Sequence, residues 1–148
     1  MQETITREHT NLMDVSLFDF PIKKVTSPLI QLENVKGELE QVTMDKQVIV
    51  YRPDTMEVLG NSRSSKYKII EPAMLFQKHA EKMMSSPDLP KNVVVTDSMY
   101  EGGRKQKRTV SFPDLTHVMP DNSKVNMRTD IFNSVDMSWM YQAFAGAY

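Results

Sequence analysis

One segment of the chain carries a helical pattern, and this pattern constrains the fold more than any other feature of the sequence. Pro72 suits the first turn of a helix, because the N–H that proline lacks would have no partner there. The side chains that follow recur at helical spacing and form one largely apolar stripe, made of Leu75, Phe76, His79, Ala80 and Met83. The run Ser85-Ser86-Pro87 ends the pattern. We therefore predict one main amphipathic helix that begins at Pro72.

The part of the chain before this helix has the pattern of a β-meander. Short runs rich in β-branched residues alternate with turn residues such as Pro53 and Asp54, where proline presets the φ angle of a turn. These runs cover residues 47–52, 56–60 and 66–70. Residues 29–42 interleave apolar and polar side chains around Gly37, a pattern that fits a helix or a strand. Strands on both sides of Gly37 are favoured.

The part after the helix predicts a β-hairpin whose turn contains Gly102 and Gly103. Residues 92–100 and 106–112 are the two strand-like runs, and adjacent glycines supply the positive φ that primed hairpin turns need. Residues 125–133 alternate in the manner of a further strand. The whole pattern predicts an α+β fold in which an antiparallel β-meander and hairpins pack on one main amphipathic helix.

The two ends of the chain differ from its middle. Residues 1–28 begin polar and then turn apolar, which predicts a mobile or partner-docking N-terminal arm, followed by a single α+β domain over residues 29–148. The segment from Trp139 to Tyr148 is apolar and aromatic and has no polar cap. Such an ending docks in the core, pairs with another chain or continues into a longer protein. We favour the last two, which predict self-association through this segment and the arm, or a chain that is the front part of a longer protein.

Composition narrows the possible functions. The chain has no cysteine, which excludes disulfides, thiolate zinc sites and cysteine nucleophiles and favours a reducing compartment such as the cytoplasm. A secretory signal pattern, a membrane-length apolar run and the motifs of common nucleotide-binding and hydrolase sites are all missing. Several aspartates invite a comparison with Mg²⁺-dependent nucleases, although turn formation explains them more simply: Asp97, Asp114, Asp121, Asp130 and Asp136. We therefore expect a non-enzymatic protein with no catalytic residues, no metal and no cofactor.

A basic segment beside the glycine turn is the feature with the most chemistry. Four cations lie within five residues, namely Arg104, Lys105, Lys107 and Arg108, with Tyr100 before them and Phe112 after them. Each Lys or Arg that meets a phosphate releases condensed counterions, and an aromatic side chain can stack on a base. The four cations are therefore predicted to neutralise nucleic-acid phosphates while Tyr100 stacks on a base.

Charge elsewhere in the chain bears on this prediction in two ways. A second basic run, Arg63, Lys66 and Lys68, extends the track if the two hairpins face the same way. The formal net charge is only −1, so nucleic-acid binding has to come from local charge. The alternative interpretation is a solvated hairpin tip whose lysines discourage pairing between strand edges. Both interpretations stay open.

A set of short segments follows one another in a characteristic order. They are residues 50–55, residues 58–60, residues 67–70 leading into the helix with Phe76, the Gly102-Gly103-Arg104 turn, and residues 133–138. In order and spacing they resemble the phage- and plasmid-borne family catalogued as domain of unknown function 932, over roughly residues 48–148. The chain departs from the family at Val135 and Met137, where relatives show Asn-Ser-His-Asp-Gly-Ser, so no role for a histidine carries over. The resemblance implies a phage origin near genes of DNA metabolism.

A second likeness concerns the fold alone. A β-meander, a helix and a basic hairpin are loosely similar to the core of single-strand annealing recombinases, which oligomerise and hold single-stranded DNA in a basic groove. Together these features predict a phage-encoded, non-enzymatic protein that binds or anneals single-stranded DNA as an oligomer, in recombination or replication in the infected cell. The alternative is a phage interaction module that binds a host or virion protein through its methionine- and aromatic-rich ends.

Overall fold

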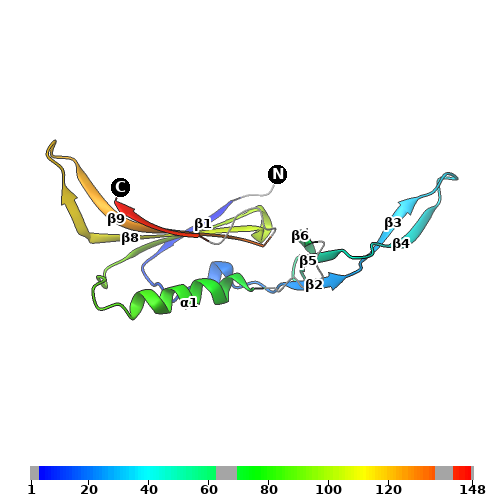
Figure 1. Cartoon of the computed structure of the whole chain (residues 1–148), viewed down its shortest axis with the longest axis horizontal. Helices are drawn as coiled ribbons and strands as arrows, with labels where there is room; N and C mark the ends of the chain where they lie inside the picture. Colours follow the sequence, from blue (N-terminus) through cyan, green and yellow to red (C-terminus); the bar gives the residue numbers. More distant parts are fainter. Residues whose placement is uncertain (1–3, 63–69, 136–141, 148) are drawn as a thin grey trace. The chain divides into compact units, whose positions relative to one another are not determined.

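The computed structural model describes residues 4–62, 70–135 and 142–147, and it confirms the predicted α+β class (Figure 1). The chain divides into two units, and the boundaries between them fall at two places in the sequence. One unit combines Met1–Phe20 with Ile70–Tyr148, and the other consists of Pro21–Ile69. The second unit is thus an insertion in the chain of the first.

The discontinuous unit is built on a five-stranded sheet with the order β1-β7-β8-β9-β10, in which all neighbours are antiparallel. Its strands are β1 (Ile5–His9), β7 (Val94–Tyr100), β8 (Lys105–Val118), β9 (Lys124–Ser134) and β10 (Gln142–Ala147). The 3₁₀ turn η2 (Glu101–Gly103) joins β7 to β8. Gly102 and Gly103 have φ angles of 71° and 113°, so the predicted glycine turn is confirmed.

The predicted helix α1 (Pro72–Met84) is also confirmed, and it lies on one side of this sheet (Figure 1). The 3₁₀ helix η1 (Ser16–Phe18) packs with it: the rings of Phe18 and Phe76 stack with their centroids 4.2 Å apart, against Ile131 of β9. A second apolar cluster gathers under the other end of α1, with Val95, Val110 and Phe112 at its centre and Met83 against it. The apolar stripe of the helix therefore faces the core, as its spacing predicts.

The inserted unit contains two small antiparallel sheets. One has the order β2-β5-β6, with β2 (Lys23–Thr26), β5 (Val48–Arg52) and β6 (Glu57–Ser62), and the other pairs β3 (Leu29–Glu33) with β4 (Leu39–Thr43). Ile22, Val48, Val50 and Leu59 form the buried apolar set of this unit. Strands on both sides of Gly37 are thus confirmed. The strand predicted over residues 66–70 falls outside the described residues except for Ile70, which is not in a strand.

Two segments differ from the sequence-based expectation. Residues 1–28 do not form one arm, because Ile5–His9 is a sheet strand, Phe18 is buried in the core and β2 belongs to the inserted unit. Strand β8 extends beyond the predicted residue 112 to Val118. It passes Pro113 through a register irregularity between Phe112 and Thr116, which accommodates a residue that has no N–H for the ladder. In the part of the chain that the structure describes, no helix has the length and apolar character to cross a membrane.

Candidate nucleic-acid interface

The basic segment is part of strand β8, and the alternation of the strand divides its cations between two faces. Gln106, Arg108, Val110 and Phe112 are buried on the side that carries α1. The side chains between them, which begin with Lys105 and Lys107, are partly exposed on the opposite side. Cations that are adjacent in the sequence, such as Lys107 and Arg108, therefore lie in different environments, one partly exposed and the other buried.

Arg108 does not have the predicted role, because its side chain is only 1% exposed. Asp97 lies directly across from it on β7, and the guanidinium donates two hydrogen bonds to that carboxylate, Nε to Oδ1 at 2.7 Å and Nη2 to Oδ2 at 3.0 Å. The rings of Phe18 and Phe76 each lie 5.9 Å from the guanidinium carbon. A guanidinium paired and packed in this way has no access to a phosphate, so this prediction is corrected.

The Arg108–Asp97 pair also holds the N-terminal segment on the sheet. Arg108 donates to the backbone carbonyls of Leu12 and Asp14, both at 2.7 Å. His9 Nε2 lies 2.8 Å from Asp97 Oδ2, and its Nδ1 accepts a hydrogen bond from the backbone N–H of Asn11, which leaves Nε2 as the donor to Asp97. The buried guanidinium of Arg108 satisfies the backbone carbonyls of Leu12 and Asp14, which explains why residues 5–18 are part of the discontinuous unit.

The charge of Arg108 also acts on His79 of α1. Burial lowers the pKa of His79 below its ordinary value of 6.5, and the positive charges of Arg108 and then Lys82 lower it further. The folded protein therefore favours neutral His79, and the unfolded chain binds more protons as the pH falls below about 6.5. Stability should thus decrease from about pH 7 to about pH 5, and His79→Gln should make this decrease smaller.

The measurement is the urea midpoint followed by circular dichroism across that pH range. Lys78→Gln is the matched control, since Lys78 is an exposed neighbour on the same helix. It should keep the decrease that the native chain shows. An unchanged decrease in His79→Gln would show that other groups cause it.

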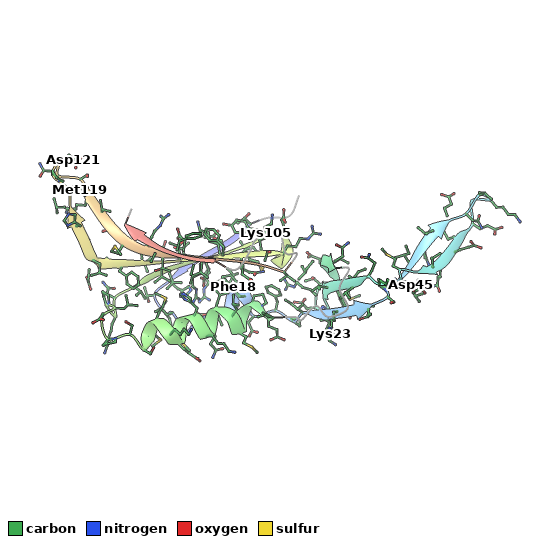
Figure 2. The ribbon with its side chains drawn as sticks, in the orientation of Figure 1. Phe18, Lys23, Asp45, Lys105, Met119 and Asp121 are labelled. Carbon is green, nitrogen blue, oxygen red and sulfur yellow. The ribbon has the colours of Figure 1, made fainter. Side chains whose placement is uncertain are left out.

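Lys105 and Lys107 lie on the opposite side of the sheet, each facing an aromatic side chain on a neighbouring strand. Tyr100 of β7 is the partner of Lys105, and Phe132 of β9 is the partner of Lys107. The Nζ of Lys107 is 5.4 Å from the centre of the Phe132 ring, within cation–π range. The Nζ of Lys105 is 3.7 Å from Glu101 Oε2 in a partly exposed ion pair. Figure 2 labels Lys105 on the side of the sheet away from α1.

This side of the sheet, which we name the outer face, carries hydroxyl, basic and aromatic side chains. The ladder registers assign to it Tyr100, Thr96 and Ser98 of β7, Lys105, Lys107, Thr109 and Ser111 of β8, Arg128 and Phe132 of β9, and Phe144 of β10. Phe144 is half exposed, and its ring forms a T-shaped pair with the ring of Phe132, with centroids 6.1 Å apart. The outer face therefore presents aromatic rings and cations across four strands, β7 to β10.

Arg128, Phe132 and Phe144 are not among the residues predicted from the sequence. The alternation over residues 125–133 assigns Arg128 and Phe132 to one face, but it does not show which strand they adjoin. Pairing of β9 with β8 supplies that information, because it sets Phe132 opposite Lys107 and Arg128 opposite Ser111. Of the predicted cations, Arg104 lies at the turn and is partly buried, and Arg63, Lys66 and Lys68 lie outside the described residues.

The outer face also contains carboxylates: Glu8 of β1, which is exposed and lies opposite Thr96 in the ladder, and Asp130, which is engaged by its neighbours. Asp130 accepts a hydrogen bond from Thr109 Oγ1 at 2.8 Å and pairs with Arg128 at 3.2 Å, so its charge is compensated locally. Asp121 lies in a turn, as predicted. The hydroxyl and the backbone N–H of Ser123 donate hydrogen bonds to its carboxylate, and these bonds lower the Asp121 pKa. Among the described residues, no three His, Asp or Glu side chains gather as metal ligands do.

No family model, curated protein or solved structure matches the chain. The resemblance to domain of unknown function 932 and the likeness to annealing recombinases therefore stay predictions.

Proposed function

We propose that this chain is a non-enzymatic protein that binds single-stranded DNA on the outer face of its five-stranded sheet. The observation that carries the proposal is the register of the ladder, which sets Lys105 opposite Tyr100 and Lys107 opposite Phe132. A single strand offers phosphates and unstacked bases. Each of these pairs has a group for both, because the ammonium can bind a phosphate and the aromatic ring can stack on a base. An unpaired strand exposes its bases for such stacking, whereas a duplex does not.

The charge of the outer face suits modest, salt-sensitive binding. Lys105, Lys107 and Arg128 are cations of this face, while Glu8 is an exposed carboxylate on it. Arg128 compensates Asp130, and Lys105 pairs with Glu101. Arg104 at the adjoining turn adds a cation next to Lys105. With a formal net charge of −1 on the whole chain, this local cluster has to supply the attraction to phosphate. We place the protein in phage DNA recombination or replication in the cytoplasm of the infected cell, and we propose that it acts as an oligomer.

The test is oligonucleotide binding by a Lys105→Ala/Lys107→Ala variant across a salt series. For single strands the slope of log K against log salt is about −0.7 per neutralised phosphate, so losing two contacts should reduce its magnitude by about 1.4. Affinity at low salt should fall by about tenfold or more. Fluorescence anisotropy with a labelled single strand measures both quantities.

The matched control is Lys78→Ala/Lys82→Ala, which removes the same charge from exposed positions of α1, on the other side of the sheet. It should keep nearly the native affinity and slope. Phe132→Leu should weaken binding by about 1–3 kcal/mol without changing the salt slope, because stacking releases no counterions. Equal losses in the outer-face and α1 variants would contradict the proposal, since general charge would then explain binding.

The alternative function, a protein-interaction module, is favoured by the strands at the sheet edges. Strand β10 is an edge of the described sheet, and its sequence has neither charge nor proline to discourage pairing with another chain. Strand β1, within the predicted arm, is the other edge. A pull-down after nuclease digestion separates the alternatives: a stoichiometric protein partner lost in Phe144→Lys would favour the interaction module.

A further inference from the structure

The cations of the outer face are arranged along one strand. Lys105 and Lys107 are on β8. Arg128 of β9 lies opposite Ser111, which is further along β8. Side chains on one face of a strand follow one another at about 7 Å, so this line of cations extends over about 20 Å. The outer-face residues that the structure describes on β1, β7 and β10 add no further cation. Positive charge therefore runs parallel to β8 and does not cross the sheet.

Glu8 places negative charge at one edge of the same face. Its side chain is exposed on β1, opposite Thr96 of β7, which in turn lies opposite Thr109 of β8. Neighbouring strands lie about 4.8 Å apart, so Glu8 is about 10 Å to one side of β8. A phosphate over β8 is largely screened from a charge at this distance, because the Debye length is about 8 Å at physiological salt. A single strand that crossed the sheet to β1 would instead bring a phosphate against the carboxylate.

The carboxylates of Asp130 and Glu101 lie closer to β8, but each is paired with a cation. Asp130 pairs with Arg128 at 3.2 Å, so the part of the outer face around Ser111 has little net charge. Glu101 forms its ion pair with Lys105 at a partly exposed site. An ion pair at such a site contributes little to stability, so a phosphate can replace the carboxylate. Neither group therefore closes the line along β8 to a phosphate.

Aromatic rings accompany this line of charge. The first three outward-facing residues of β8 each have a ring in register, on Tyr100 of β7, then Phe132 of β9, then Phe144 of β10. Phe132 and Phe144 form a T-shaped pair, and Phe144 is half exposed. The described residues of β1 include no aromatic side chain. Two of these three rings therefore lie on the β9 and β10 side of β8, where bases can stack on them.

We propose that a bound single strand follows β8 between η2 and Phe112, with its phosphates over β8 and its bases turned toward β9 and β10. The two lysines of β8 meet successive phosphates. Phe132 and Phe144 stack on bases, and Tyr100 stacks on a base at the turn. This inference rests on the proposed function and deepens it, because it names the path that the ligand takes on the outer face. The competing path crosses the sheet from β10 to β1.

Two substitutions that each add one unit of positive charge to the outer face distinguish these paths. Ser111→Lys extends the line of cations along β8, and Glu8→Gln removes the carboxylate of β1. One further phosphate contact changes the slope of log K against log salt by about −0.7, which corresponds to about fourfold in affinity at about 0.15 M salt. Ser111→Lys should show this gain with a labelled oligothymidylate in fluorescence anisotropy. Glu8→Gln should keep the native affinity and slope at this salt concentration.

The opposite result, a gain in Glu8→Gln and none in Ser111→Lys, would overturn the path along β8 and favour a strand that crosses the sheet. Equal gains would overturn it as well, since added charge anywhere on the face would then suffice. Glu8 is exposed on an edge strand, so Glu8→Gln should fold like the native chain. A gain in this variant alone is therefore enough to reject the path. Circular dichroism of both variants checks that they are folded.

The double variant Lys105→Ala/Lys107→Ala separates a failure of the path from a failure of the proposed function. If the double variant binds more weakly than the native chain while Ser111→Lys brings no gain, the outer face binds DNA and only the path is wrong. If the native chain does not bind the oligothymidylate, or the double variant binds it as tightly as the native chain does, the proposed function itself fails and the path fails with it.

Discussion

Replacing Arg108 with methionine is expected to lower the free energy of unfolding by about 3–5 kcal/mol, the usual cost of removing one partner from a buried ion pair. The substitution leaves the Asp97 carboxylate, which is 1% exposed, without its two guanidinium hydrogen bonds. The carbonyls of Leu12 and Asp14 lose their donors as well. Urea denaturation followed by circular dichroism measures the loss.

Lys107→Met is the matched control, because Lys107 precedes Arg108 on the same strand and faces the other side of the sheet. Its effect should stay within about 0.5 kcal/mol, as for other surface substitutions. Adding Asp97→Leu to Arg108→Met should cost less than the two single losses together, since the uncompensated charge is then gone. If Arg108→Met were as mild as Lys107→Met, the ion pair would not hold the N-terminal segment in place.

Replacing Gly103 with alanine is expected to destabilise the fold by about 2–6 kcal/mol, through a strained backbone and an overpacked contact. Gly103 has a φ of 113°, which L side chains rarely adopt, and it is buried. A Cβ at this position would lie 2.9 Å from Cζ and 3.1 Å from Cε2 of Phe20. Phe20 is itself 6% exposed, so its ring has little room to move away.

Gly37→Ala provides the comparison for this substitution. Gly37 also has a positive φ, 79°, but the nearest atom to an added Cβ is Glu33 Oε1 at 3.5 Å, at the end of a flexible side chain. The cost there should be about 1–2 kcal/mol, from the backbone alone. Equal losses at Gly37 and Gly103 would show that the contact with Phe20 contributes nothing. Thermal unfolding of the two variants side by side gives the difference.

Local patterns predicted the parts of this fold that depend on neighbours in the chain. The helix from Pro72, the strands around Gly37 and the glycine turn at residues 102–103 all form as expected. Proline at a helix start, positive φ at glycine and the periodicity of apolar residues act within a few residues. Lys105, Lys107 and Tyr100 could likewise be recognised as a basic and aromatic set beside a turn.

Long-range pairing decided the rest. The sequence alone does not distinguish Lys107 from Arg108, since both are cations of the same basic segment. In the structure, Arg108 pairs with Asp97 on β7, and the ammonium of Lys107 lies over the ring of Phe132 on β9. Likewise, Ile5–His9 completes a sheet with a strand some ninety residues later, and the division into two units separates Phe20 from Pro21. The sequence by itself determined the helix, most of the strands between residues 29 and 133, and where the cations are concentrated. Only the tertiary structure decided which of those cations is buried, because the face that a strand presents to the core depends on the strands and the helix that pack against it.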